Sequence, residues 1–192
     1  MSRQHWKGSV LLAPVPAALV TCGTYEKPNV LTIGWTGIVC THPPMTYISV
    51  RPERFSHDII KNSGEFVINL TTSAMIKETD FCGVKSGRDI DKFAACGFHT
   101  ERSAKLNTPL IEECPVCLEC KVTESKLLGS HTMFLAEIVS VDVDERYIDS
   151  KGKLNLQQCG LAAYAHGEYF ALGRKLGDFG YSVRKKKKPK KK

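Results

Sequence analysis

The chain has 192 residues, 42% of them hydrophobic, so it can bury one substantial core but is too short for two large domains. Its formal net charge of +7 comes from the end of the chain, where residues 184–192 hold eight of the 27 basic residues, and the remaining 19 face 20 acidic ones. The body is therefore close to neutral, which argues against a basic nucleic-acid-binding face. The apolar runs are shorter than a membrane-spanning helix requires, so we expect no membrane insertion.

The first half of the chain alternates strands with turns and short helices. Strands are predicted at 18–22, 30–39 and 45–50, a helix at 56–63, a strand at 65–70, and short helices at 73–81 and 93–97. Gly34 and Gly37 lie inside the second strand, where glycine indicates a bulge or the close approach of a backbone or ligand. Ser56 is the predicted N-cap of the first helix, and Gly64 ends it.

The second half returns to strands. They are predicted at 116–123 and 133–143, joined by 127–132, and at 169–172, where a last strand would close the sheet. Many short strands with only small helices between them predict a closed or nearly closed antiparallel barrel. We expect one domain over residues 1–180 and a disordered basic tail over 181–192.

Eight cysteines would suit a disulfide framework in a small secreted protein. We expect no signal peptide, because residues 1–8 are polar and the apolar stretch 10–20 contains two prolines and lacks a cleavage-like end. The cysteines are therefore expected to be reduced, in a cytoplasmic protein, with several of them acting as small core residues.

A candidate anion site precedes the first helix. Arg51 and Arg54 lie just before Ser56, where a helix start offers free N–H groups and partial positive charge, and guanidinium groups bind phosphate in bidentate fashion. An ordinary helix start with two solvated arginines explains these residues equally well. Both interpretations stay open on spacing alone.

Two further segments carry weaker signals. The loop 83–93 offers backbone and lysine donors, but its glycine spacing fits neither a P-loop nor a dinucleotide fingerprint, and a mobile surface loop is the simpler interpretation. Residues 29–36 offer hydroxyl groups, a glycine and Trp35, which suits a flat heterocycle, although Trp35 filling the core is the commoner arrangement.

Other reactive residues do not assemble into a catalytic or metal motif. Cys114, Cys117 and Cys120 have metal-like spacing, but on a strand Cys117 and Cys120 point to opposite faces, so we expect structural cysteines and no metal. His131 lies in a strand connection and is most simply a surface histidine. We identify no catalytic residue and no constellation that indicates hydrolysis.

An ordered series of short motifs resembles the flavin reductase-like, flavoredoxin-type branch of the FMN-binding split-barrel proteins. The matching segments are Pro14 and Pro16, Thr21 to Gly23, Asn29 to Thr36, Pro43 and Pro44, Ile48 to Ser56, Gly64 to Leu70, and Gly83 to Phe93. Gly129 to His131 and Glu137 to Val139 also resemble the second half of the family pattern. The resemblance runs from about residue 10 to residue 180, and its ordered set is more specific than any single motif.

The resemblance implies a mainly β protein with a six-stranded antiparallel Greek-key split barrel, a few short helices, a homodimer, and FMN bound near the subunit interface. It places Asn29, Thr32, Gly34, Trp35 and Thr36 around the isoalloxazine and ribityl groups, with Ile33 and Ser49 in the same cofactor set. It places Arg51, Arg54, Ser56, Ser86 and Lys92 around the phosphate.

The leading hypothesis from the sequence is an NAD(P)H-dependent flavin oxidoreductase that transfers hydride through bound FMN, because the flavin performs the chemistry and the protein supplies position and electrostatics. The alternative is a flavoredoxin-type electron carrier reduced by a protein partner. A third hypothesis is a nucleic-acid-binding or scaffolding role for the lysine-rich tail. We favour the simpler interpretation, a solvated tail that makes no nucleic-acid contact.

Overall fold

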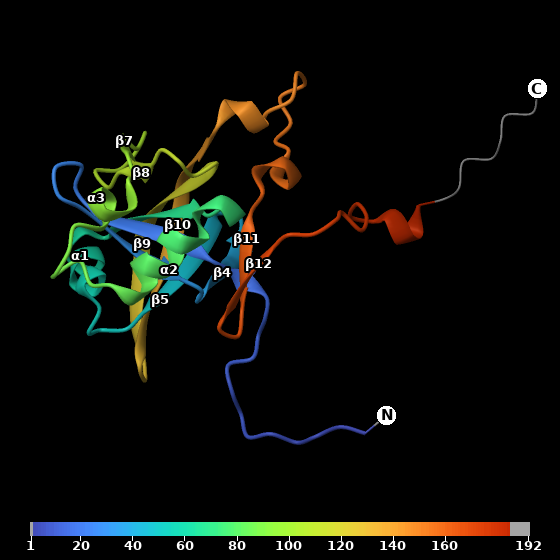
Figure 1. Ribbon diagram of the computed structural model, residues 1–192, viewed down its shortest axis with the longest axis horizontal. Helices are drawn as coiled ribbons and strands as arrows, with labels where there is room; N and C mark the ends of the chain where they lie inside the picture. The colour runs from blue at the N-terminus through green and yellow to red at the C-terminus, as the bar shows by residue number, and fades with distance from the viewer. Residues whose placement is uncertain (1, 185–192) are drawn as a thin grey trace, which may run out of the picture.

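The computed structural model describes residues 2–184 and is built on one seven-stranded antiparallel sheet (Figure 1). Its strands are β2 (Ala18–Gly23), β3 (Pro28–Ile33), β4 (Thr36–Thr41), β5 (Pro44–Val50), β6 (Glu65–Leu70), β9 (Val116–Leu128) and β10 (His131–Val143). They are ordered β3-β2-β6-β9-β10-β5-β4. The mainly β class is confirmed, with seven strands in this sheet instead of the six implied by the resemblance.

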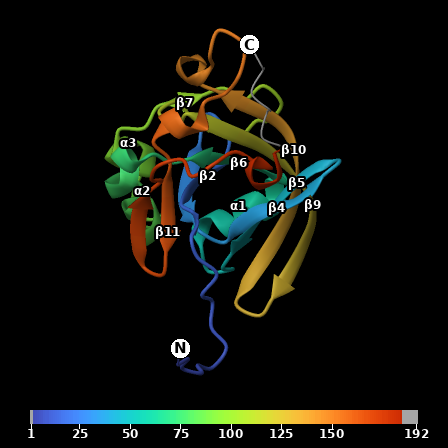
Figure 2. The ribbon, with the colours of Figure 1, turned by 90° about the vertical axis from the view of Figure 1, so that its right-hand side faces the viewer.

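The single strand predicted at 30–39 is wrong, because the structure divides this stretch between two strands, β3 and β4. The chain leaves β3 at Ile33, passes through Gly34 and Trp35, and begins β4 at Thr36. β3 and β4 lie at opposite edges of the same sheet. Two residues can join opposite edges only when the sheet curls until those edges approach each other, so this link closes one end of the barrel. Figure 2 shows the curl of the sheet.

A small second sheet packs beside the barrel. It contains β1 (Val15–Pro16), β11 (Ala162–Ala165) and β12 (Glu168–Ala171) in the order β1-β11-β12. The strand predicted at 169–172 is therefore present, but it pairs with β11 and does not close the main sheet, which corrects that expectation. A two-stranded ribbon of β7 (Thr100–Glu101) and β8 (Leu110–Ile111) lies in the connection that precedes β9.

Three α-helices lie in the connections between strands: α1 (Phe55–Ser63), α2 (Ile76–Val84) and α3 (Lys92–Cys96). The single-turn 3₁₀ segments are η1 (Ser73–Met75), η2 (Glu145–Tyr147), η3 (Leu156–Cys159) and η4 (Tyr181–Val183). Gly64 ends α1 in the left-handed conformation, at φ 69°, as predicted. The predicted N-cap is wrong: Arg54 occupies the cap position without a side-chain cap bond, and Ser56 lies inside the helix.

Two apolar clusters occupy the two faces of the sheet. The first fills the barrel and includes Val20, Phe66 and Phe134, whereas the second packs between the outer face and the α2–α3 region. Cys120 belongs to the first cluster and Cys117 to the second. The predicted opposite orientation of these two cysteines is confirmed, and it follows from the period of two along a strand.

A buried carboxyl group on β9 holds a neighbouring loop, and a half-buried carboxyl group lies beside it on β10. Glu119 is fully buried, and its two oxygens accept hydrogen bonds from the backbone N–H groups of Ala104 and Lys105 at 2.7 and 2.8 Å. Asp142 on the neighbouring strand has a buried Oδ2 with no hydrogen-bond partner among the described residues. Burial, followed by the nearby Glu119 carboxylate, raises the pKa of Asp142 to about 6.

The substitution Asp142→Asn is expected to stabilise the protein by roughly 1 kcal/mol more at about pH 8 than near pH 5, after allowance for solvent screening of this half-buried group. The folded protein retains a proton that the unfolded chain releases near the ordinary aspartate pKa of 3.8, so wild-type stability falls as pH rises towards 6. Asparagine removes this dependence because it stays neutral. Urea unfolding at both pH values tests this, and an equal difference at the two values would contradict it.

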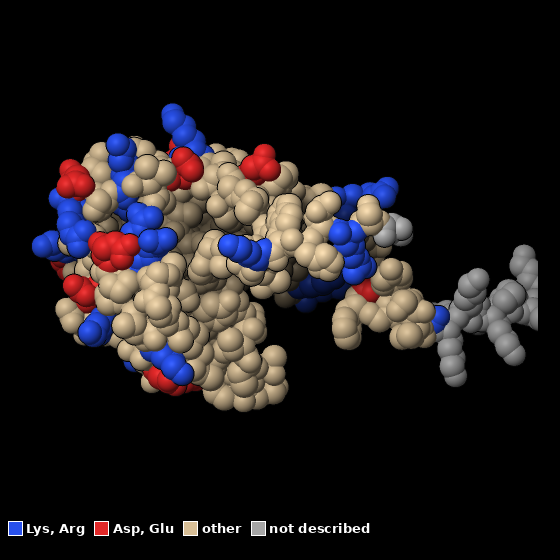
Figure 3. All heavy atoms as spheres, turned by 90° about the horizontal axis from the view of Figure 1, so that it is seen from below, with Lys and Arg blue, Asp and Glu red and all other residues tan. Residues whose placement is uncertain are grey.

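Both ends of the described chain project from the body (Figure 1). No described helix has the length and apolar character that crossing a membrane would require. On the face shown in Figure 3, acidic and basic side chains intermingle on the body and do not form one basic patch. The lysine run at 185–192 and its expected disorder lie outside the described residues.

Candidate functional site

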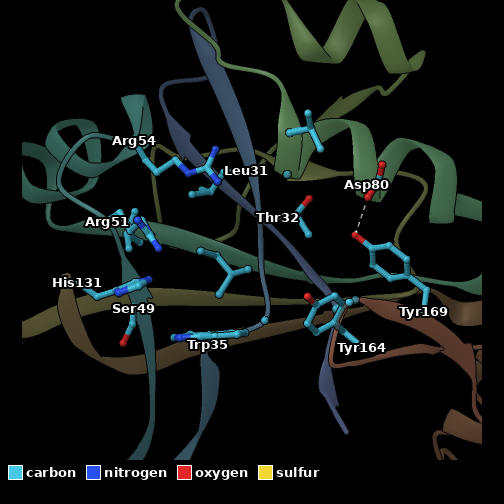
Figure 4. A pocket seen from close by; sticks show the side chains of 17 residues that line it. Leu31, Thr32, Trp35, Ser49, Arg51, Arg54, Asp80, His131, Tyr164 and Tyr169 are labelled. Atoms are coloured by element: carbon cyan, nitrogen blue, oxygen red, sulfur yellow. Dashed lines mark hydrogen bonds between the residues drawn. The ribbon is translucent and has the colours of Figure 1, made fainter. Parts of the chain in front are cut away.

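A cavity of about 360 Å³ opens where the β3–β4 link faces α2 and the second sheet (Figure 4). Three aromatic side chains, Trp35, Tyr164 and Tyr169, line one part of it, and Arg51 and His131 line another (Figure 4). Trp35 is 39% exposed, so its ring forms part of the cavity wall and does not fill the core. The cavity therefore presents aromatic faces to a planar ligand, with the cationic Arg51 and the imidazole of His131 at its other end.

A second cavity of about 350 Å³ adjoins the first. The two share Leu31, Thr32, Arg51, Arg54 and Gly83 as lining residues. The second cavity has five basic lining residues, Arg51, Arg54, Lys85, Arg88 and Lys92, and one acidic residue, Glu53. This excess of cations, beside the first turn of α1, suits a phosphate group.

The position of Trp35 follows from the crossing between the two sheet edges. Trp35 lies between β3 and β4, and its carbonyl accepts a hydrogen bond from the Ser49 N–H on β5 at 2.9 Å. This bond fixes the link against β5 although neither residue of the link is in a strand. The side chains of Trp35 and Ser49 consequently face the same cavity (Figure 4).

Close packing of α2 on β3 forms the wall shared by the two cavities. The Thr32 hydroxyl donates to the Thr79 carbonyl of α2. A Cβ atom at Gly83 would lie 3.3 Å from the Thr32 Cβ, so glycine permits the helix to approach this closely. Thr32 therefore lines both cavities while its hydrogen is used to hold α2.

Lys92 is a buried cation at the floor of the second cavity. Lys92 is only 5% exposed. Its ammonium group donates to the carbonyls of Val30 and Cys82 at 2.7 and 2.8 Å. Desolvation lowers the pKa of Lys92 from its ordinary value. Two of its three donor hydrogens therefore bridge β3 and α2, and one remains for a ligand.

Asn29 supports the site from behind. Its amide donates to the Ser56 hydroxyl at 2.7 Å and to the Cys22 sulfur at 3.4 Å, and it lines neither of the two cavities. A Cβ atom at Gly87 would lie 2.1 Å from the Asn29 Oδ1, so the loop after α2 can reach this position only with glycine. Ser56 lines the second cavity even though it is almost fully buried.

Most of the residues predicted to contact the cofactor are brought together. Thr32, Ile33, Gly34, Trp35, Ser49, Arg51 and Arg54 line the first cavity, and Ser56, Ser86 and Lys92 line the second. Asn29 and Thr36 lie outside both linings. The Thr36 hydroxyl instead donates to the Tyr47 carbonyl at 2.6 Å, which joins β4 to β5.

Sequence reasoning missed the contribution of the second sheet. Tyr164 and Tyr169 are direct partners across β11 and β12, and their ring centroids are 5.5 Å apart. The Tyr169 hydroxyl donates to Asp80 on α2 at 3.1 Å (Figure 4). Burial, followed by Asp80, raises the pKa of Tyr169 to about 12, so it remains a donor. The signal in the sequence was two tyrosines on either side of a His-Gly turn.

His131 also lines the first cavity and is not simply a surface residue. It begins β10, and its Nδ1 lies 2.9 Å from the Ser130 hydroxyl. Desolvation, followed by the positive charge of Arg51, lowers the pKa of His131 below its ordinary value. The imidazole is therefore neutral at physiological pH and serves as a hydrogen-bonding group beside the arginine.

Comparison with known proteins identifies a shared domain. Residues 11–173 match the model of the flavin reductase like domain. An uncharacterised protein of Archaeoglobus fulgidus is 32% identical over 144 residues, which cover 75% of this chain and 81% of the relative.

Solved structures give the same picture. Flavoredoxin of Desulfovibrio vulgaris superposes with a TM-score of 0.88 at 27% identity, covering 95% of this chain and 100% of the other. An FMN-binding protein from Thermus thermophilus superposes with a TM-score of 0.78 at 22% identity, covering 93% and 99%, which shows that the fold is shared.

Proposed function

Because the chain belongs to the flavin reductase-like family, we propose that it binds FMN non-covalently in the two adjoining cavities and transfers hydride from NAD(P)H through it. The observation that carries this proposal is the division of the site into an aromatic part and a cationic part. A flavin mononucleotide has the same division, with a planar ring system at one end and a single phosphate at the other.

The residues present fit each end of this ligand. Trp35, Tyr164 and Tyr169 offer apolar faces for the ring system. Arg54 and Lys92 offer positive charge to the phosphate, and Ser86 offers a hydroxyl group. Thr32 and Gly83 line both cavities, where the ribityl chain would pass.

The flavin supplies the hydride-accepting centre when bound, and the chain's own residues supply position and electrostatics. Arg51 places positive charge at the side of the first cavity, where it would stabilise negative charge on a reduced ligand. His131 beside it donates or accepts a hydrogen bond as a neutral imidazole. Tyr169, held by Asp80, limits the opposite side of the cavity and keeps its proton.

Purified protein reconstituted with FMN is expected to show flavin absorption bands, which bleach on anaerobic addition of NADH or NADPH. The bleaching should be rapid and stoichiometric, with one nicotinamide oxidised per flavin reduced, since a hydride donor stacked on the flavin at about 3–3.5 Å reacts without a further protein. Stopped-flow absorption at the flavin band is the measurement. Protein that remains colourless after incubation with FMN or FAD would refute the cofactor assignment.

A second candidate is an electron carrier reduced by a protein partner, which the structural similarity to flavoredoxin favours. The same experiment separates the two functions. Flavin bands that appear but persist with both nicotinamides, and bleach with a chemical reductant, would favour the carrier.

We also propose a homodimer in which the open edge of the barrel is covered by a second copy. β4 is an edge strand, and its Ile38 and Val39 are 68% and 51% exposed. Exposed apolar edge strands are normally covered in native proteins. Light scattering that gives the mass of one chain at micromolar concentration would contradict this proposal.

We further propose that residues 1–180 form a single domain and that the protein is cytoplasmic. The family match over residues 11–173 supports the first part. All eight cysteines are free, which suits a reducing compartment and supports the second.

A further inference from the structure

Two cysteines lie in contact at the base of the loop that borders the second cavity. Cys82 on α2 and Cys96 at the end of α3 are separated by 14 positions, and their sulfur atoms are 3.7 Å apart. Among the described residues, which include all eight cysteines, this is the one pair of thiols in hydrogen-bonding contact with each other. The sulfur of Cys117, by contrast, points to the carbonyls of Ile111 and Cys114.

The contact has consequences for the loop between the two helices. Residues 85–91 connect α2 to α3 and carry Ser86 and Arg88, which line the second cavity. Cys82 lines that cavity as well, and its carbonyl accepts a hydrogen bond from Lys92 at 2.8 Å. A bond between the two sulfurs would therefore close the base of this loop.

We propose that Cys82 and Cys96 form a reversible intramolecular disulfide on exposure to a peroxide, and that this bond restricts opening of the 85–91 loop. The sulfur atoms need only approach from 3.7 Å to a bond length of about 2.05 Å, a movement that side-chain rotation can supply. The two helices already hold the two sulfur atoms against each other.

The reaction begins at Cys96, because Cys96 is half-buried and Cys82 is almost fully buried. The Cys96 sulfur attacks one peroxide oxygen, the O–O bond breaks, and water leaves with the thiol proton. Cys82 then attacks the resulting sulfenic sulfur, and a second water leaves. One peroxide is reduced and two thiols are oxidised to one disulfide; a dithiol reverses the step by exchange.

The pair is expected to react slowly at neutral pH. Burial raises the pKa of Cys82 to about 12 and also raises the pKa of Cys96. Both thiols are therefore protonated, and the thiolate is the nucleophile. Selectivity for this pair comes from the proximity of the two sulfurs, which lets the second thiol capture the sulfenic acid before it oxidises further.

Peptide mapping of the full chain tests the bond. Trypsin places the two cysteines in separate peptides, 78–85 and 93–102, with no other cysteine in either. After hydrogen peroxide and alkylation, we expect these peptides to be recovered as one species lacking two hydrogen atoms, and to separate after dithiothreitol. Recovery of both peptides unlinked would overturn the proposal, and so would a disulfide at any other cysteine that forms before the bond between Cys82 and Cys96.

Two variants make the test specific. Cys96→Ser should abolish the linked species, whereas Cys40→Ser, at a partly exposed cysteine on β4, should leave its yield unchanged. Native proteolysis reads the effect on the loop, because trypsin must open the loop to cut after Lys85 or Arg88. Oxidation should slow these cuts by at least about threefold in the wild type and not in Cys96→Ser.

Equal cleavage rates before and after oxidation would overturn the loop restriction, even if the bond forms. Both measurements use flavin-free protein. Their outcome is therefore separate from whether FMN binds.

Discussion

Replacing Arg54 by glutamine is expected to weaken FMN binding by about 10- to 100-fold while leaving riboflavin binding nearly unchanged. Arg54 lines both cavities, and its side chain makes no hydrogen bond or ion pair with the described residues. A charge-assisted hydrogen bond to phosphate contributes about 1.5–3 kcal/mol, and this contribution is lost in the variant. Riboflavin lacks the phosphate, so it reports only on the ring and ribityl contacts.

Quenching of flavin fluorescence gives both dissociation constants. Lys61→Gln is the matched control, because it removes one positive charge from α1 at a residue that lines neither cavity. It should change FMN affinity by less than about threefold, through long-range electrostatics alone. If Arg54→Gln weakened riboflavin as much as FMN, Arg54 would act on the ring or on the fold instead of the phosphate.

Replacing Lys92 by methionine is expected to lower the free energy of unfolding by about 2–4 kcal/mol. The ammonium group donates to the carbonyls of Val30 and Cys82, which join β3 to α2 behind the second cavity. Methionine fills a similar volume but leaves both buried carbonyls without this donor. Since α2 forms a wall of both cavities, weaker flavin binding should accompany the loss of stability.

Urea unfolding followed by far-UV circular dichroism measures the change. Lys85→Met is the matched control, since Lys85 also lines the second cavity but is exposed. It should leave the free energy of unfolding within about 0.5 kcal/mol of the wild type. An unchanged denaturation midpoint for Lys92→Met would show that the bridge between β3 and α2 contributes nothing to stability.

The link at Gly34 and Trp35 shows why local patterns mislead here. A run of β-branched residues at 30–39 predicts an extended chain correctly, but extension is the same whether the chain remains in one strand or passes to the other edge of a sheet. Only the pairing of β3 with β2 and of β4 with β5 reveals the crossing. The exposed Trp35 and much of the cavity follow from that non-local pairing.

The partners of the buried polar residues also could not be inferred from local sequence. Asn29 and Ser56 both belong to the motif series, yet Asn29 lines neither cavity and its amide donates to the Ser56 hydroxyl. Lys92 was expected near the phosphate, and the structure shows that two of its hydrogen bonds are structural. A sequence identifies a polar residue in a motif, but whether it faces a ligand or a backbone carbonyl depends on which elements pack around it.

By itself, the sequence determined the mainly β class, the positions of most strands and the opposite faces of Cys117 and Cys120. An ordered motif series also selected residues for the predicted cofactor site, most of which line the two cavities. These features follow from local periodicity, turn chemistry and family pattern. The tertiary structure alone decided the crossing at Trp35, the separate sheet that brings Tyr164 and Tyr169 to the cavity, and the contact between Cys82 and Cys96. Each of these joins residues that are distant in the chain or that local patterns treat alike, so only the packing of the strands and helices could reveal them.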